Sequence, residues 1–208
     1  MKPIRAARFA GVVLLATYAY TRLYLGPGLD TTLAWSQRQE WLATHGLAWS
    51  LGGWLWMLAV FAWMLFLIAL MHEYTPMHRV ATNLQSGLVL ISAILLLIGI
   101  LAWGNVLPRM ATPETAGLVD ALALTLLAGG LFMAGGVTAW IGVDLSCLEK
   151  LPPAWVGPGV LAGLCALPTP FLLPRTALLH VGFVSLLAWY AFLGSRRRLP
   201  SAFPEYRP

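Results

Sequence analysis

Residues 126–142 read LLAGGLFMAGGVTAWIG, an apolar run in which small residues recur along the chain. In lipid every backbone polar group must be hydrogen-bonded within the span, so this run is predicted to be an α-helix despite its glycines. The small residues that form a stripe along one side of it are Ala128, Gly129, Gly130, Gly135, Gly136 and Gly142. Such a stripe lets neighbouring helices approach to backbone contact, which predicts the central helix of a bundle. The alternative is that these glycines only reflect the composition of membrane spans.

The composition of the chain places it among integral membrane proteins. Hydrophobic residues make up 59% of the 208 residues and charged residues only 10%, against about 25% charged in a globular protein. A chain of this length forms one domain and has no room for a soluble catalytic module beside its spans. The formal net charge is +5, but the basic residues lie at the ends of predicted helices, so nucleic acid is excluded as a partner.

The hydropathy pattern predicts an all-α polytopic membrane bundle with six transmembrane helices. The predicted spans are residues 9–25, 47–71, 87–104, 117–143, 155–173 and 175–194. The first could instead be a signal peptide cleaved near Ala19, but its length of about 17 residues suffices for a span whose flanking arginines snorkel. Residues 1–195 are expected to form the bundle and residues 196–208 a cytoplasmic tail.

Two connections of the predicted bundle are distinctive. The first span is expected to end at Gly26-Pro27-Gly28. Residues 30–46 are then predicted to form a short interfacial helix between the first two spans, with Asp30 as N-cap, Arg38 away from the apolar face and Gly46 closing it. An exposed loop is the alternative for this segment. Residues 72–86 are predicted to be a polar turn between the second and third spans.

Three tryptophans of the second span share one face of the helix. Trp49, Trp56 and Trp63 are seven residues apart, so their stripe drifts by only about 20° per repeat. Trp56 lies near mid-depth, although tryptophan prefers the membrane interface. We expect the rings to fill the gaps beside the glycine-rich helix; the alternative is a wall for a flat lipophilic ligand such as a quinone, a carotenoid or haem.

An outer layer of ionisable residues is the second candidate site. Arg22, Asp120 and His180 come to similar depth in the predicted spans, and charged groups at membrane depth normally pair or line a cavity. A structural salt bridge and a ligand-binding site both remain open. The full set of candidate ligand-binding residues is therefore Arg22, Asp120, His180, Trp49, Trp56 and Trp63.

Catalytic and metal-binding motifs are not found in the sequence. His72 and His78 are six residues apart with a proline between them, whereas a zinc-protease motif needs histidines four apart on one helix. Depth matching leaves His45 and His180 as the geometrically possible pair of axial haem ligands. No CxxC, phosphate loop or GxSxG element is present. We predict no catalytic residue, no metal site and no particular cofactor.

The six spans, the glycine-rich fourth span and the fifth span opening on PAWVGPG at residues 153–159 resemble a bacterial family of six-helix membrane proteins whose biochemical role is unassigned. The resemblance covers residues 49–194 and implies a multi-pass protein of the bacterial inner membrane. It implies no catalytic residues.

Three classes of function follow from these observations. The favoured one is an accessory, assembly or lipid-interacting subunit, whose partners are membrane lipid and other membrane-protein subunits. The second is a small-molecule carrier that uses Arg22, Asp120 and His180. The third is a quinone-, pigment- or haem-binding membrane subunit built on the tryptophan stripe.

The distribution of positive charge predicts that both termini are cytoplasmic. With that orientation nine of the 13 Lys and Arg residues face the cytoplasm, and the four others are Arg22, Arg38, Arg109 and Arg175. A reporter enzyme that functions only in the cytoplasm is expected to be active when it is fused after Pro208. Activity of a periplasm-specific reporter at the same position would contradict six spans with this orientation.

Overall fold

The computed structural model describes residues 2–30, 33–75, 79–172 and 177–196, and every regular element in them is a helix. The long helices are α1 (Pro3–Tyr20), α4 (Gly46–Tyr74), α5 (Val80–Leu101), α6 (Pro113–Cys147), α7 (Pro153–Ala166) and α9 (Ala177–Ser195). The short segments between them are η1 (Thr21–Leu25), α2 (Gly26–Leu29), α3 (Trp35–Thr44), η2 (Ala102–Val106), η3 (Leu107–Arg109) and α8 (Thr169–Leu172). The predicted all-α class is confirmed.

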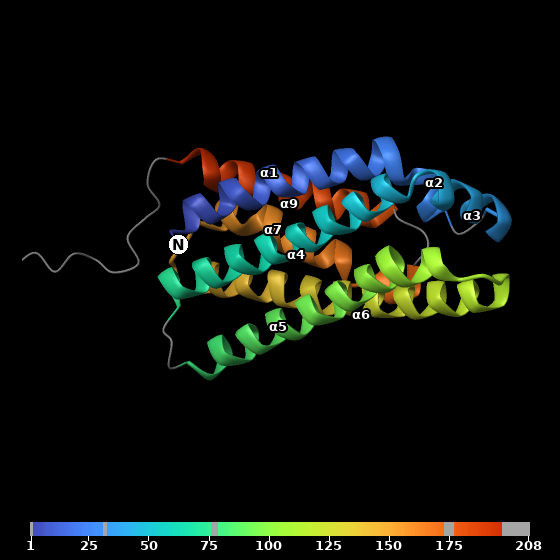
Figure 1. Ribbon diagram of the computed structural model, residues 1–208. Helices are drawn as coiled ribbons and strands as arrows, with labels where there is room; N and C mark the ends of the chain where they lie inside the picture. The colour runs from blue at the N-terminus through green and yellow to red at the C-terminus, as the bar shows by residue number, and fades with distance from the viewer. Residues whose placement is uncertain (1, 31–32, 76–78, 173–176, 197–208) are drawn as a thin grey trace, which may run out of the picture.

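The long helices form a closed ring. Each packs against the next one along the chain, from α1 through α4, α5, α6 and α7 to α9, and α9 packs back against α1. The Arg8 Nε donates a hydrogen bond of 2.7 Å to the Gly194 carbonyl and joins the start of α1 to the end of α9. Figure 1 shows the N-terminus and the last turns of α9 at one end of the bundle, and α2 and α3 at the other. The ring therefore has a core that all six helices share.

Four helical segments are long and apolar enough to cross a membrane. They are α4, the continuous segment Val80–Arg109, α6 and α9. Large apolar side chains also face outward, with Val12 70%, Trp54 69% and Leu118 72% exposed. Apolar surface of this kind is typical of a lipid-facing bundle. These features support a membrane protein, and four of the predicted spans correspond to helices that are long and apolar enough to cross a membrane.

The other two predicted spans correspond to α1 and α7. Helix α1 carries Arg5 and Arg8 in its first two turns, which lowers its mean hydropathy. Helix α7 has only 14 residues, about 21 Å of helix, and falls short of a bilayer core of about 30 Å. That α1 and α7 also cross the membrane, which would make six spans, stays a prediction.

The start of the chain differs from the prediction at Gly26-Pro27-Gly28. The chain does not leave the helical conformation there but continues through η1 into α2. Pro27 stands in the first turn of α2, directly after the π-helical segment. The helical path ends one residue after α2, at Asp30, whose backbone is extended.

The predicted interfacial helix exists as α3, but its boundaries and its buried face were predicted wrongly. Its N-cap is Ala34 and not Asp30, and Gly46 is the first residue of α4. Arg38, which was expected away from the apolar face, is only 3% exposed and lies one turn before the buried Leu42. The reason is an ion pair with helix α6, described below.

The predicted polar turn over residues 72–86 is also wrong. Helix α4 continues to Tyr74 and α5 begins at Val80, so only residues 75–79 separate them. Gln85 is fully buried in α5 because its Nε2 donates a 2.9 Å hydrogen bond to Asp144 of α6. Residues 76–78, with His78, and residues 197–208 of the predicted tail lie outside the described part of the chain.

The glycines of α6 face two different neighbours. A Cβ on Gly135 would lie 2.6 Å from the Gly163 carbonyl oxygen of α7, and one on Gly142 would lie 2.7 Å from the Val160 side chain. A Cβ on Gly130 would lie 2.8 Å from Leu96 of α5. Helix α6 therefore packs closely against α7 on one side and α5 on the other.

The predicted single stripe needs correction at its two remaining glycines. A Cβ on Gly136 would lie 3.6 Å from Leu167, an ordinary contact distance, and one on Gly129 would have no atom within 4 Å. Gly129 does not take part in helix packing, because it lies between the two faces that α5 and α7 cover.

Gly135→Ala is expected to destabilise the bundle by about 1 to 3 kcal/mol, because the added methyl group would press on the backbone of α7. Gly129→Ala is the matched control on the same helix, and it should leave stability unchanged or raise it by up to about 1 kcal/mol through helix propensity. Denaturant titration in detergent, followed by circular dichroism, measures both. Equal effects of the two variants would contradict close packing at Gly135.

Candidate functional site

The interior of the helix ring contains a cavity of about 770 Å³. Its lining comes from all six long helices and from the segments η1, α2 and η2. Its volume lies within the range of about 300–1,000 Å³ that is common for small-molecule sites. Most of the lining is apolar, as expected for a site that holds a lipophilic molecule.

The tryptophan stripe of α4 forms one wall of this cavity. Trp49, Trp56 and Trp63 all line it. Fourteen residues of helix separate the first ring from the last, so the wall extends about 21 Å along the bundle. Trp49 and Trp63 are at the same time buried in the packed core, at 4% and 8% exposed. The three rings therefore pack between helices and also border the cavity, and their role in binding a ligand stays a prediction.

Hydrogen bonds fix the orientation of these three rings. The Trp49 indole N–H donates to the Trp103 carbonyl at 2.9 Å. The Trp56 N–H donates to the Thr21 hydroxyl at 2.9 Å, and the Trp63 N–H donates to the Thr138 hydroxyl at 3.2 Å. Since each N–H already has a partner, the rings offer a ligand their apolar surfaces.

Polar groups gather where η1 and α9 meet the cavity. Arg22, Asp30 and His180 line it, as does Tyr18, whose hydroxyl lies 3.2 Å from the His180 Nδ1. The structure thus brings two of the three predicted outer residues, Arg22 and His180, to one cavity. Arg22 makes no ion pair within the described ranges of the chain.

Both π-helical segments contribute to the cavity wall. Thr21, Arg22 and Leu25 come from η1, and Trp103 and Gly104 come from η2. A π-helical turn inserts one extra residue into a helix and is frequent at functional sites. Here the two segments each place a large side chain, Arg22 and Trp103, on the lining of the same cavity.

Asp120 does not belong to this polar group, which corrects the prediction. It is not a lining residue, and its carboxylate forms an ion pair with Arg38 of α3. Arg38 donates to both carboxylate oxygens, with a distance of 3.2 Å from Nη2 to Oδ1. The proposed pairing of Asp120 with Arg22 or His180 is therefore wrong.

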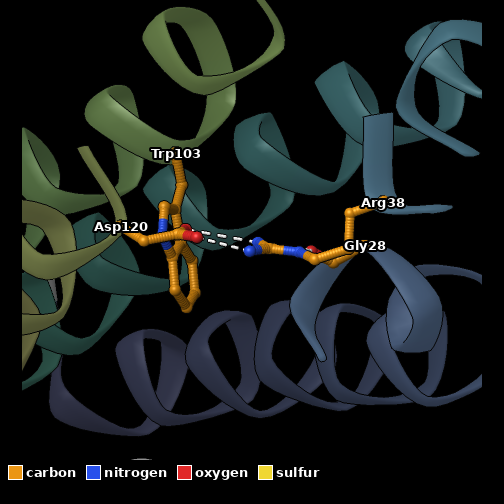
Figure 2. Close-up of polar contacts among 4 residues, drawn as sticks. All are labelled: Gly28, Arg38, Trp103 and Asp120. Atoms are coloured by element: carbon orange, nitrogen blue, oxygen red, sulfur yellow. Dashed lines mark hydrogen bonds and ion pairs between the residues drawn. The ribbon is translucent and has the colours of Figure 1, made fainter. Parts of the chain in front are cut away.

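Figure 2 shows the Arg38 guanidinium extended toward Asp120, with Trp103 beside the carboxylate. The Trp103 indole N–H donates to the Asp120 Oδ1 at 3.0 Å. Arg38 also donates to the Gly28 carbonyl through Nε at 3.2 Å and Nη2 at 3.0 Å. This network, together with the Trp49 to Trp103 bond, connects α2, α3, α4, η2 and α6 at one end of the cavity.

The sequence contains a signal for the burial of Arg38. Arg38 precedes Leu42 by four residues, so both lie on the same face of a helix. An arginine on the apolar face of a short amphipathic helix indicates a buried partner. The identity of that partner is not visible in the sequence, because it lies 82 residues further along the chain.

A second polar network lies at the opposite end of the bundle. Arg79 Nη1 is 3.4 Å from the Asp144 carboxylate, which also accepts the Gln85 bond. Asp144 does not line the cavity, whereas Thr138 does. A carrier needs a polar path from one end of the bundle to the other, and the described lining does not provide a continuous one.

The described residues contain no group of three or more potential metal ligands. Of the predicted haem-ligand pair, His180 lines the cavity, but His45 does not and instead stacks on Trp41 with ring centroids 4.8 Å apart. Cys147 and Cys165 are free thiols. These positions do not fit axial ligation of a haem in the cavity by the two histidines.

Comparison of the chain with protein-family models, curated proteins and solved structures finds no match. The resemblance to a bacterial six-helix family stays a prediction.

Asp120→Asn is expected to destabilise the protein by about 3 kcal/mol, because it leaves the buried Arg38 without a counter-charge. Combining it with Arg38→Gln should recover part of this loss and give a coupling energy above about 1 kcal/mol in a double-mutant cycle. Cycles with Arg22→Gln and with His180→Gln are the controls, and both should be additive within about 0.5 kcal/mol. Coupling to Arg22 but not to Arg38 would contradict the observed ion pair.

Proposed function

We propose that this protein is a non-catalytic, lipid-interacting membrane subunit that holds one lipophilic molecule inside its helix ring. The observation that carries the proposal is the cavity of about 770 Å³ with apolar walls, a tryptophan face and polar groups at one end. Binding of a lipophilic ligand there is favourable because its apolar surface leaves water, or because van der Waals contacts replace empty space.

Two features favour holding a ligand over carrying it across the membrane. The charged groups Arg22 and Asp30 and the polar His180 share one end of the cavity. At the other end of the bundle, Asp144 is occupied by Arg79 and Gln85. A carrier needs a route that opens to both sides, and the polar groups do not mark one.

Binding of a quinone or a carotenoid is the second candidate, because the tryptophan wall also suits a flat conjugated molecule. An absorption spectrum of the purified protein separates the candidates. A band above the protein absorbance would favour a pigment, and a spectrum of protein alone would favour a lipid.

We further propose that α1 and α7 complete six spans in the bacterial inner membrane, with both termini in the cytoplasm. Arg5, Arg8, Arg79, Lys150 and Arg196 lie near the helix ends at the N-terminal side of the bundle. The positive-inside rule places this side in the cytoplasm.

Native mass spectrometry of the protein released from mild detergent tests ligand binding. We expect one bound lipid per chain in the wild type and loss of most of it in Gly53→Leu, because the larger side chain would occupy the cavity. Gly53 lines the cavity, and a Cβ there would meet only the Gly104 backbone, at 3.9 Å. The change is therefore expected to fill space without displacing a neighbour.

Gly129→Leu is the matched control, since Gly129 lies outside the cavity and a Cβ there meets no atom within 4 Å. Gly104→Leu, at another open lining position, serves as a second cavity-filling variant. Equal lipid occupancy in the wild type, both cavity variants and the control would contradict the proposal.

A further inference from the structure

We infer that the cavity selects a lipid with a phosphodiester head group, whose phosphate binds the Arg22 guanidinium while an acyl chain lies along the tryptophan wall. This inference rests on the proposed function and names the class of ligand. Four features carry it: the position of Arg22 along the bundle, its lack of an ion pair among the described residues, the geometry of the wall and the charge balance at the same end.

The spacing of Arg5 and Arg22 along the bundle matches the distance between the two membrane interfaces. Residues 5 to 22 follow one helical path through α1 into η1. At a rise of 1.5 Å per residue, Arg5 and Arg22 are about 25 Å apart along it, close to the hydrocarbon thickness of about 30 Å. If Arg5 lies at one interface, Arg22 lies near the other.

Arg22 has no ion-pair partner among the residues that the structure describes. The ion pairs among the described residues use Arg38 and Arg79, and no contact of this kind involves Arg22. Its side chain borders the cavity and is exposed on its other side. A guanidinium in this position can form two parallel hydrogen bonds to a phosphate, the geometry for which arginine is suited.

The part of the cavity next to Arg22 has room for an acyl chain along the tryptophan wall. Trp56 donates to the hydroxyl of Thr21, the residue before Arg22, so the charged end and the tryptophan wall are directly connected. The wall continues to Trp63, about 10 Å deeper along α4, and ends at Thr138 of α6. A head group at Arg22 therefore places its acyl chain on the rings.

The charge balance limits the head group. Asp30 lines the same end, so a second negative charge on the ligand would meet a carboxylate. A phosphodiester carries one negative charge, whereas a phosphomonoester lipid carries up to about two at neutral pH. The site therefore favours the diester.

The test compares three probes by native mass spectrometry of the full-length protein: dioleoyl phosphatidylglycerol, dioleoylglycerol and inorganic phosphate. The first two share their acyl chains and differ in the phosphodiester. We expect phosphatidylglycerol to bind the wild type about tenfold more tightly or better than dioleoylglycerol, the size of one charge-assisted contact. Inorganic phosphate alone should not bind at comparable concentration, because it lacks the chain.

Arg22→Gln should abolish this preference while dioleoylglycerol binds as before. Arg109→Gln is the matched control, since Arg109 is exposed, does not line the cavity and changes the net charge equally. Equal affinity of the two lipids for the wild type overturns the inference while leaving lipid binding intact. An unchanged preference in Arg22→Gln, an equal loss in Arg109→Gln, or binding of inorganic phosphate as tight as that of the lipid also overturns it. Failure of all lipids to bind would instead contradict the proposed function.

Discussion

The close approach of α6 and α7 at Gly135 and Gly163 is the constraint on which the rest of the bundle depends. At this point the backbones of the two helices are in contact, since a Cβ on either residue would lie within 3 Å of the other helix. On another side of the ring, α4 presents its tryptophans to the interior. Helices held close by glycine on one side and kept apart by large rings on another cannot close their common interior, and a cavity remains.

The end of the ring that contains α2 and α3 is stabilised by polar contacts and not by apolar packing alone. Arg38, Asp120, Trp103 and the Gly28 carbonyl satisfy one another in a buried network. Desolvating such a pair is costly, so its value lies less in net stability than in fixing where α3 packs. By positioning α2 and α3, the network also fixes the end of the cavity at which Arg22 and Asp30 lie.

Asp120 and Arg22 differ in whether another side chain of the fold pairs with their charge. Asp120 is used entirely within the fold, while Arg22 faces the cavity without an ion-pair partner among the described residues. A charge that the fold neutralises is structural, whereas a charge left at the mouth of an apolar cavity can recognise a ligand of opposite sign. This contrast supports the proposed lipid-holding role, in which Arg22 of η1 would recognise the head group.

The sequence alone determined the helical class, the approximate positions of the long helices and the shared face of Trp49, Trp56 and Trp63. These follow from local rules, since lipid forces each span to satisfy its own backbone and helical periodicity sets which residues share a face. The positions of Arg22, Asp120 and His180 within the predicted spans also indicated a similar depth for the three residues. Only the tertiary structure decided that Arg22 and His180 meet at the cavity while Asp120 turns to Arg38 and Gly129 faces no helix. Depth fixes position along the membrane normal, whereas contact also requires the same angle around the bundle axis, and that angle depends on how all six helices pack.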